Sequence, residues 1–235
     1  MENLILLHGA LGSAATLAPL KNELEANYRI YTLDFSGHGG KPLPESPFAM
    51  PLFAQNILQL MEQEQLERAH IFGYSMGGYA ALYFALQYPE RVKSIFTLAT
   101  KFAWSAEAAE KEGKMLNPEK IQEKVPHFAQ TLAQRHAPQR WQDVMLKTAE
   151  MMRHLGDSPA LTASLLAQIQ VPVLVAVGDR DNMVTPEETI WTYRQLANAS
   201  LLVLPDTRHP LEAVSPGILA QTIRQFLAPK NVTIS

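Results

Sequence analysis

Short apolar runs alternate along the chain with segments in which apolar residues recur every three or four positions. Most of the runs are continuously apolar, which is typical of strands that are covered on both faces of a parallel sheet. The predicted strands are Leu4–Leu7, Arg29–Leu33, Ala69–Phe72, Val92–Leu98, Pro172–Val177 and Ser200–Leu204. The predicted helices are Leu17–Glu25, Pro51–Glu64, Met76–Gln87, Pro186–Leu196 and Pro216–Phe226. This order predicts an α/β domain with a mostly parallel, doubly wound sheet of about six strands.

Residues 101–167 interrupt the alternation, because they contain no strand pattern and are dominated by Glu, Lys, Gln and Ala. One helical stripe within them carries Trp141, Met145, Thr148, Met152 and Leu155. We therefore predict several helices inserted between the fourth and fifth strands. Residues 1–100 and 168–235 would form the core, and residues 101–167 a helical cap.

The composition of the cap leaves two readings of its side chains open. Its Met and Trp residues either pack against one another or line an apolar pocket, since Met adapts to irregular shapes. The charged residues from Lys101 to Lys124 are expected to form a solvated face.

Length, charge and cysteine content narrow the classes of function. The 235 residues suffice for one α/β domain with a hydrophobic core. The formal net charge of −3 gives no basic surplus for nucleic acid or an anionic membrane. The absence of cysteine excludes disulfides, thiolate zinc sites and cysteine nucleophiles. No stretch approaches the ~18 apolar residues of a spanning helix, and no signal-peptide pattern is visible. These features predict a cytoplasmic protein without membrane insertion, and they leave its oligomeric state open.

A G-x-S-x-G sequence at residues 73–77 is the main chemical signal. It follows a predicted strand and opens a predicted helix, so the turn would present Ser75 at the carboxyl edge of the sheet. A serine hydroxyl is a weak nucleophile without a base. The base must therefore come from another part of the chain.

Two later strands end in residues that supply this need. Asp179 and Asp181 follow one strand, and His209 follows the next. Because the strands are parallel, these side chains are expected at the same edge as Ser75. A histidine can take the serine proton and return it to the leaving group, while a carboxylate orients the imidazole.

Backbone donors for a developing oxyanion are expected at two turns. The N–H groups of Ala10, after the first strand, and of Met76, after Ser75, would point toward it. His8, beside Ala10, is expected to hold this loop in place, and no residue pattern indicates a metal site or an organic cofactor.

These residues together resemble the α/β-hydrolase fold family over most of the chain. The matching segments are residues 6–10 (LLHGA), 34–39 (DFSGHG), 73–78 (GYSMGG), 172–181 (PVLVAVGDRD) and 208–212 (RHPLE). The resemblance implies the strand order 2-1-3-4-5-6, with Ser75, Asp181 and His209 as the catalytic triad and residues 101–167 as the cap. It favours Asp181 over Asp179 as the acid. Two positions depart from the family pattern: Arg208 stands where Gly is frequent, and Gly40 where Ser is frequent.

The resemblance implies hydrolysis of a small or medium-sized, partly apolar ester or thioester through an acyl-enzyme on Ser75, with a small molecule as the substrate. Carbon–carbon bond hydrolysis or lysis by the same triad is an alternative that would need carboxylate-binding arginines, for which Arg135, Arg140 and Arg153 are candidates. A non-catalytic ligand-binding protein on the same fold is a second alternative. Dehalogenases and epoxide hydrolases of the family are disfavoured, because they have Asp where Ser75 stands.

Overall fold

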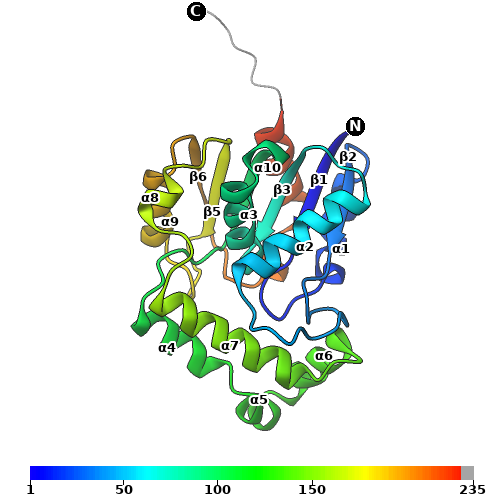
Figure 1. The fold of residues 1–235 in the computed structure, drawn as a ribbon, viewed down its shortest axis with the longest axis vertical. Helices are drawn as coiled ribbons and strands as arrows, with labels where there is room; N and C mark the ends of the chain where they lie inside the picture. Colours follow the sequence, from blue (N-terminus) through cyan, green and yellow to red (C-terminus); the bar gives the residue numbers. More distant parts are fainter. Residues whose placement is uncertain (229–235) are drawn as a thin grey trace, which may run out of the picture.

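A single parallel sheet of six strands forms the centre of the computed structural model, which describes residues 1–228 (Figure 1). The strand order is β2-β1-β3-β4-β5-β6, and every neighbouring pair is parallel. The strands are β1 (Glu2–Leu7), β2 (Tyr28–Leu33), β3 (Ala69–Tyr74), β4 (Val92–Leu98), β5 (Val173–Gly178) and β6 (Ala199–Leu204). The predicted fold class and strand order are therefore confirmed.

Burial along the strands explains why they read as continuous apolar runs. The four inner strands are almost wholly buried, because helices cover both faces of the sheet, whereas the edge strands β2 and β6 remain partly exposed. In the register, Leu7 of β1 lies opposite Gly73 of β3, and Gly73 lies opposite Thr97 of β4. The carboxyl ends of these three strands therefore meet at one edge.

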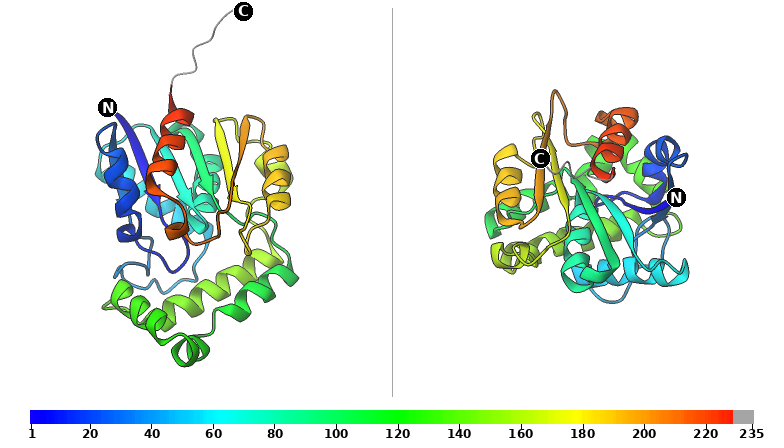
Figure 2. Two further views of the ribbon diagram at one scale, coloured as in Figure 1. Left: turned by 180° about the vertical axis from the view of Figure 1, so that it is seen from behind. Right: turned by 90° about the horizontal axis from the view of Figure 1, so that it is seen from above.

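Two layers of helices enclose the sheet (Figure 2). On one face, α1 and α10 contact each other over a hydrophobic cluster that includes Leu20 and Ile223. On the other face, α2 and α3 contact each other over a second cluster, and α8 packs against α3 and α9. The helices of the core are α1 (Ala18–Leu24), α2 (Met50–Gln63), α3 (Met76–Gln87), α8 (Ala163–Leu166), α9 (Pro186–Gln195) and α10 (Pro216–Leu227), with 3-10 turns η1 (Ala14–Leu17), η2 (Pro89–Arg91) and η3 (Leu211–Ala213).

Four further helices lie across the carboxyl edge of the sheet, between β4 and β5 (Figure 1). They are α4 (Ala106–Met115), α5 (Pro118–Lys124), α6 (Pro126–His136) and α7 (Trp141–Asp157). Helix α4 packs closely along α7, since a Cβ on Gly156 would lie 2.5 Å from the Cβ of Ala109. We call α4–α7 the cap; the division of the chain at residues 101 and 167 stays a prediction.

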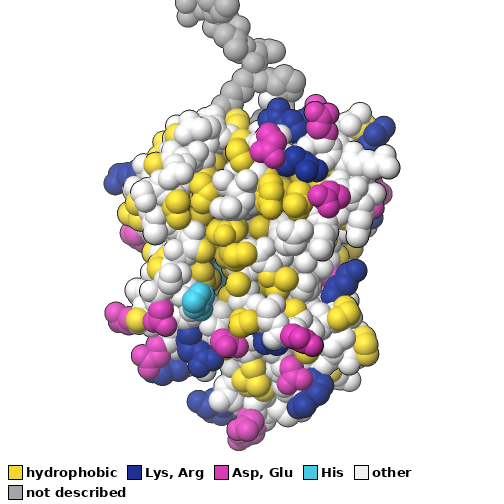
Figure 3. Space-filling model, viewed as in Figure 1, with side chains coloured by type: hydrophobic (Ala, Val, Ile, Leu, Met, Phe, Trp, Pro, Cys, Tyr) yellow, Lys and Arg dark blue, Asp and Glu magenta, His cyan; other side chains and the backbone are white. Residues whose placement is uncertain are grey.

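The apolar stripe predicted on α7 is the buried side of that helix. Trp141, Met145, Thr148 and Leu155 are all buried, and Met152 is partly buried. Charged side chains crowd the outer surface of the cap in the space-filling view, with apolar side chains between cap and core (Figure 3). Met115 departs from both predicted roles of the cap methionines, because it is half exposed at the end of α4.

Candidate active site

Ser75 occupies a strained turn between β3 and α3. Its φ of 51° and ψ of −119° lie in a region that side-chain-bearing residues rarely adopt. The Ser75 N–H donates to the carbonyl of Leu98 over 2.8 Å, and the Thr100 hydroxyl donates to the Ser75 carbonyl over 3.0 Å. The turn is tight enough that a Cβ on Gly73 would lie 2.5 Å from the backbone of Gly77. The G-x-S-x-G pattern thus has the backbone geometry that its spacing predicts.

His209 and Asp181 meet at the same edge of the sheet. The Nδ1–H of His209 donates to Oδ2 of Asp181 over 2.8 Å, and both residues are buried. This bond places the proton on Nδ1 and leaves Nε2 as an acceptor. The hydroxyl of Tyr74 donates to the backbone carbonyl of His209 over 3.0 Å, so β3 also fixes the histidine loop.

The second oxygen of Asp181 anchors its own loop. Oδ1 accepts from the N–H groups of Met183 and Val184, each over 2.8 Å. Burial raises the pKa of Asp181, but the hydrogen bonds from His209, Val184 and Met183 outweigh it, so the net pKa is below the ordinary value. Asp179 instead accepts from the Thr207 N–H over 3.1 Å. Of the two aspartates, it is therefore Asp181 that orients His209.

Two backbone N–H groups remain open beside Ser75. Within residues 1–228, the amides of Ala10 and Met76 donate no hydrogen bond, and both residues line the cavity that also contains Ser75. Met76 is the first residue of α3, where an N–H has no partner in the helix. The predicted pair of oxyanion donors is therefore brought to the same cavity.

His8 fixes the loop that carries Ala10. Its Nε2 accepts from the Phe35 N–H over 3.2 Å, so its proton lies on Nδ1, which donates to the Gly9 carbonyl over 2.8 Å. Burial lowers the pKa of His8 to about 4, so the ring is neutral at pH 7. This agrees with the structural role predicted for His8.

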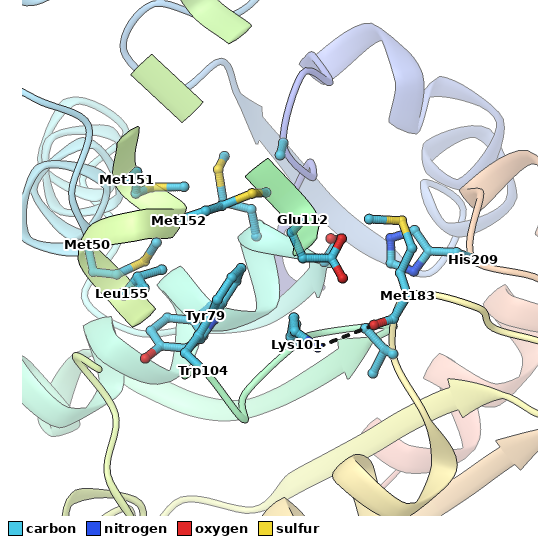
Figure 4. Close-up of a pocket in the computed structure, with 14 residues that line it drawn as sticks. Met50, Tyr79, Lys101, Trp104, Glu112, Met151, Met152, Leu155, Met183 and His209 are labelled. Atoms are coloured by element: carbon cyan, nitrogen blue, oxygen red, sulfur yellow. Dashed lines mark hydrogen bonds between the residues drawn. The ribbon is translucent and has the colours of Figure 1, made fainter. Parts of the chain in front are cut away.

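The cavity is small, apolar and shared by core and cap (Figure 4). Its volume is about 40 Å³. The residues lining it are Ala10, Met50, Ser75, Met76, Tyr79, Lys101, Trp104, Glu112, Met151, Met152, Leu155, Met183, Val184 and His209. Trp104, just before α4, and the cap residues Met151 and Met152 therefore line a pocket, while Trp141 and Met145 pack in the core. A bound acyl chain would need these methionine side chains to change rotamer, which they do readily.

Two charged residues contradict the predicted solvated face of residues 101–124. Lys101 is partly buried and its ammonium pairs with Glu188 over 3.2 Å. Glu112 is only 3% exposed, and its Oε2 is buried without a hydrogen-bond partner. Both line the cavity, so the charge run in the sequence concealed two pocket residues. On α4, Glu110 and Lys111 are exposed, and the signal that sets Glu112 apart is its position three residues after the apolar Ala109.

The remaining basic candidates lie outside the cavity. Arg208 is exposed and Arg153 is exposed, while Arg140 pairs with Asp143 on the surface. Arg135 is half-buried and donates to the Leu11 carbonyl over 2.8 Å. Among residues 1–228, the cavity therefore has Lys101 as its sole lysine or arginine.

The departure at Gly40 has a steric cause. Its φ is +84°, and a Cβ there would lie 2.6 Å from the carbonyl oxygen of Ala137 at the end of α6. Next to it, the Gly39 N–H donates to Nδ1 of His136 over 3.2 Å, and Nε2–H of His136 donates to the Leu11 carbonyl over 3.2 Å. The loop around residue 40 is thus in close contact with the end of α6.

No group of three or more His, Cys, Asp or Glu in residues 1–228 has the arrangement of a metal site. In the same residues, no helix combines the length and the apolar character needed to cross a membrane.

Comparison with known proteins now decides the family. The sequence model of the α/β-hydrolase fold matches residues 2–142 of this chain. The chain belongs to the α/β-hydrolase fold family. Lipase 3 of Moraxella sp. (strain TA144) is 26% identical over 226 residues, which cover 88% of this chain and 71% of the lipase. A putative 2-succinyl-6-hydroxy-2,4-cyclohexadiene-1-carboxylate synthase of Bacillus subtilis is 24% identical over 96% of this chain and 90% of its own.

Solved structures confirm the fold of this α/β hydrolase. A malate-bound thermophilic esterase from Thermogutta terrifontis has a TM-score of 0.79 at 21% identity, covering 97% of this chain and 89% of the esterase. At that identity the likeness concerns the fold. The predictions of the family, the fold class and a hydrolase enzyme are confirmed, whereas the roles of individual site residues and the cytoplasmic location stay predictions.

Proposed function

We propose that this α/β hydrolase cleaves small or medium-sized, partly apolar carboxylic esters or thioesters through an acyl-enzyme on Ser75. The observation that carries the proposal is the 2.8 Å hydrogen bond from His209 to Asp181. His209 lines the same cavity as Ser75, which lies in a strained turn. A buried imidazole oriented by a carboxylate has no structural need for a serine in a strained conformation beside it. A nucleophile paired with a base explains all three features.

The proposed reaction begins at the Ser75 hydroxyl. Nε2 of His209 takes the proton as Oγ attacks the ester carbonyl, and Asp181 stabilises the imidazolium that forms. The N–H groups of Ala10 and Met76 stabilise the oxyanion of the tetrahedral intermediate. His209 then gives its proton to the leaving alcohol or thiol, and the acyl group stays on Ser75. Water activated by His209 releases the acid and restores the serine.

The hydrogen bonds of residues 1–228 do not include one from Ser75 Oγ to His209 Nε2. Such bonds between a nucleophile and its base are often long in the free enzyme and tighten when the substrate binds. The two side chains line one cavity, which is the arrangement that the proposed step requires.

Carbon–carbon bond cleavage by the same residues is the alternative. The similarity to the Bacillus subtilis protein named as a putative carboxylate synthase supports it. The cavity argues against it here. Arg135, Arg140 and Arg153 do not line the cavity, and Lys101 is already paired with Glu188. An apolar wall with a buried glutamate suits an ester better than a substrate that carries a carboxylate.

The test combines an active-site label with ester turnover. Wild type and Ser75→Ala are treated with a fluorophosphonate and assayed with short-chain p-nitrophenyl esters, with Ser164→Ala as the exposed-serine control. We expect labelling and turnover in wild type and Ser164→Ala. In Ser75→Ala, we expect no labelling and a loss of turnover of about 10⁴-fold or more.

Two other outcomes would change the assignment. If wild type is labelled but turns over no ester, the carbon–carbon alternative takes first place. If wild type is not labelled, Ser75 is not an activated nucleophile, and the chain acts as a ligand-binding protein on this fold.

A further inference from the structure

Glu112 is the one charged side chain of the cap that is both buried and directed into the cavity (Figure 4). It lies on the side of α4 that faces α7 and the core, next to Ala109 in helical spacing. The exposed positions of the same helix carry Glu107, Glu110 and Lys114, which are solvated. A residue in the position of Glu112 would normally be apolar, because burying a carboxyl group is unfavourable unless it is hydrogen-bonded.

The structure within residues 1–228 gives this carboxyl group no partner. Its Oε2 is buried and makes no hydrogen bond, and no ion pair to Glu112 is formed. A buried polar atom without a partner is destabilising, so its persistence needs an explanation. The cavity supplies one, because a ligand bound beside Ser75 and His209 would lie against this group.

Lys101, which lines the same cavity, is bound to other groups. Lys101 Nζ donates to Glu188 over 3.2 Å and to the Met183 carbonyl over 3.4 Å. The other oxygen of Glu188 accepts from the N–H groups of Phe102 and Ala103, each over 2.8 Å. Glu188 therefore fixes Lys101 and compensates its charge.

The buried position of Glu112 also acts on the pKa of its carboxyl group. Burial raises the pKa of Glu112 above its ordinary value, while the charge of Lys101 acts in the opposite direction with a smaller effect. A carboxyl group accepts hydrogen bonds through its oxygens, and it donates one when it is protonated. An uncharged partner that can both donate and accept, such as a hydroxyl or an amide, suits either form.

A second unpartnered group lies on the same wall. The indole Nε1–H of Trp104 is buried and makes no hydrogen bond within residues 1–228. Trp104 also lines the cavity. Two open polar atoms on an otherwise apolar, methionine-rich wall indicate a ligand that is mainly apolar and carries a polar group.

We propose that Glu112 recognises the substrate, by hydrogen-bonding an uncharged hydroxyl or amide group on an otherwise apolar ester, and that it excludes esters bearing a carboxylate. The inference rests on the proposed ester hydrolysis at Ser75. A site that hydrogen-bonds a substrate group discriminates strongly against an analogue that lacks it. A carboxylate would instead lie in an apolar cavity without a free cation.

The experiment measures selectivity with four methyl esters that differ in one terminal group. Methyl hexanoate, methyl 6-hydroxyhexanoate, monomethyl adipate and methyl 6-aminohexanoate carry a methyl, hydroxyl, carboxylate and ammonium group, and a pH-stat records acid release at pH 7.5. The variants are Glu112→Gln, which keeps hydrogen bonding, and Glu112→Leu, which removes it. Glu110→Leu on the exposed side of α4 is the matched control.

We expect wild type to prefer the hydroxy ester over the carboxylate ester by about tenfold or more in kcat/KM, which corresponds to about 1.4 kcal/mol. Wild type should also prefer the hydroxy ester over methyl hexanoate, and Glu112→Gln should keep most of that preference. Glu112→Leu loses that preference, chiefly through KM, while Glu110→Leu keeps it. Melting temperatures verify folding, and Glu112→Leu is not expected to melt lower than wild type, because it buries no polar group.

The outcomes separate this inference from the proposed function. If Ser75 is labelled and esters are cleaved, but Glu112→Leu keeps the hydroxyl preference, then recognition by Glu112 is wrong and ester hydrolysis stands. A wild-type preference for the ammonium or carboxylate ester likewise overturns it. If no member of the series is cleaved and no label binds, the proposed function itself has failed.

Discussion

The core wall and the cap wall of the cavity are built on different principles. On the core wall, His209 and Asp181 are joined to each other and to their loops by hydrogen bonds, and the open donors are backbone N–H groups of Ala10 and Met76. On the cap wall, in which we include Trp104 just before α4, the open atoms belong to the side chains of Glu112 and Trp104, among methionines. A rigid wall suits a reaction that is common to many substrates. A methionine-rich wall can repack around different apolar groups, so discrimination between substrates falls to its few open polar atoms.

The largest expected effect comes from breaking the core wall at Asp181. Asp181→Asn keeps the size of the side chain but favours the wrong imidazole tautomer, so kcat should fall on the order of 10⁴-fold. Asp179→Asn is the matched control, because an amide oxygen can still accept from the Thr207 N–H, and its kcat should stay within a few-fold of wild type. Equal losses in the two variants would show that Asp181 has no special role.

Buried histidines in the core and at the contact of cap and core should make the stability of the protein depend on pH. Burial lowers the pKa of His8 and of His136 to about 4, from about 6.5 in the unfolded chain. The unfolded state therefore binds more protons as the pH falls, and the stabilisation present above pH 6.5 is lost toward pH 4. For each histidine this amounts to roughly 3 kcal/mol at pH 4. Arg135 lies beside His136 and disfavours its charged form further.

Urea unfolding between pH 4.5 and 7.5 measures this dependence. His136→Gln is neutral throughout and should flatten the slope of unfolding free energy against pH, whatever it does to the stability at pH 7.5. The exposed His127→Gln should leave the slope unchanged. An unchanged slope in His136→Gln would mean that this histidine is accessible to protons in the folded state.

The smallest expected effect concerns the steric contact of cap and core at Gly40. Gly40→Ala places a Cβ against the Ala137 carbonyl at a positive φ, and should destabilise the protein by roughly 1–3 kcal/mol. Gly113→Ala in α4 meets no atom within 4 Å, so it should stabilise by up to about 1 kcal/mol through helix propensity. Thermal melts of both variants measure this difference. If the two melting temperatures shift in the same direction, the predicted steric contact at Gly40 is wrong.

Residues 1–100 and the last two strands were the predictable part of this protein. Apolar runs, prolines in first turns and the spacing of residues 73–77 are local signals, and the structure places Ser75, Asp181 and His209 at the one edge where parallel strands bring them. Met76–Gln87 was predicted to the residue because its start follows the turn and its end precedes Pro89.

The roles of Glu112, His136 and Thr100 were not predictable, because they depend on contacts between distant segments. Glu112 lies in a charged run that looks solvated, and only the packing of α4 against α7 turns it inward. His136 finds its partners at Leu11 and Gly39, more than 90 residues away in the chain. Without coordinates, a local pattern cannot distinguish such a histidine from a surface one.

The positive φ of Ser75 has a consequence for engineering. At that backbone conformation glycine is the residue under least strain, so stability and chemistry favour different residues at position 75. A directed-evolution campaign that selects only for heat resistance would act against the proposed nucleophile, because of its strained backbone. It would also favour an apolar replacement of Glu112, because that carboxyl group is buried without a partner. Libraries for this protein therefore need turnover as the selected trait, with those two codons held constant when robustness alone is scored.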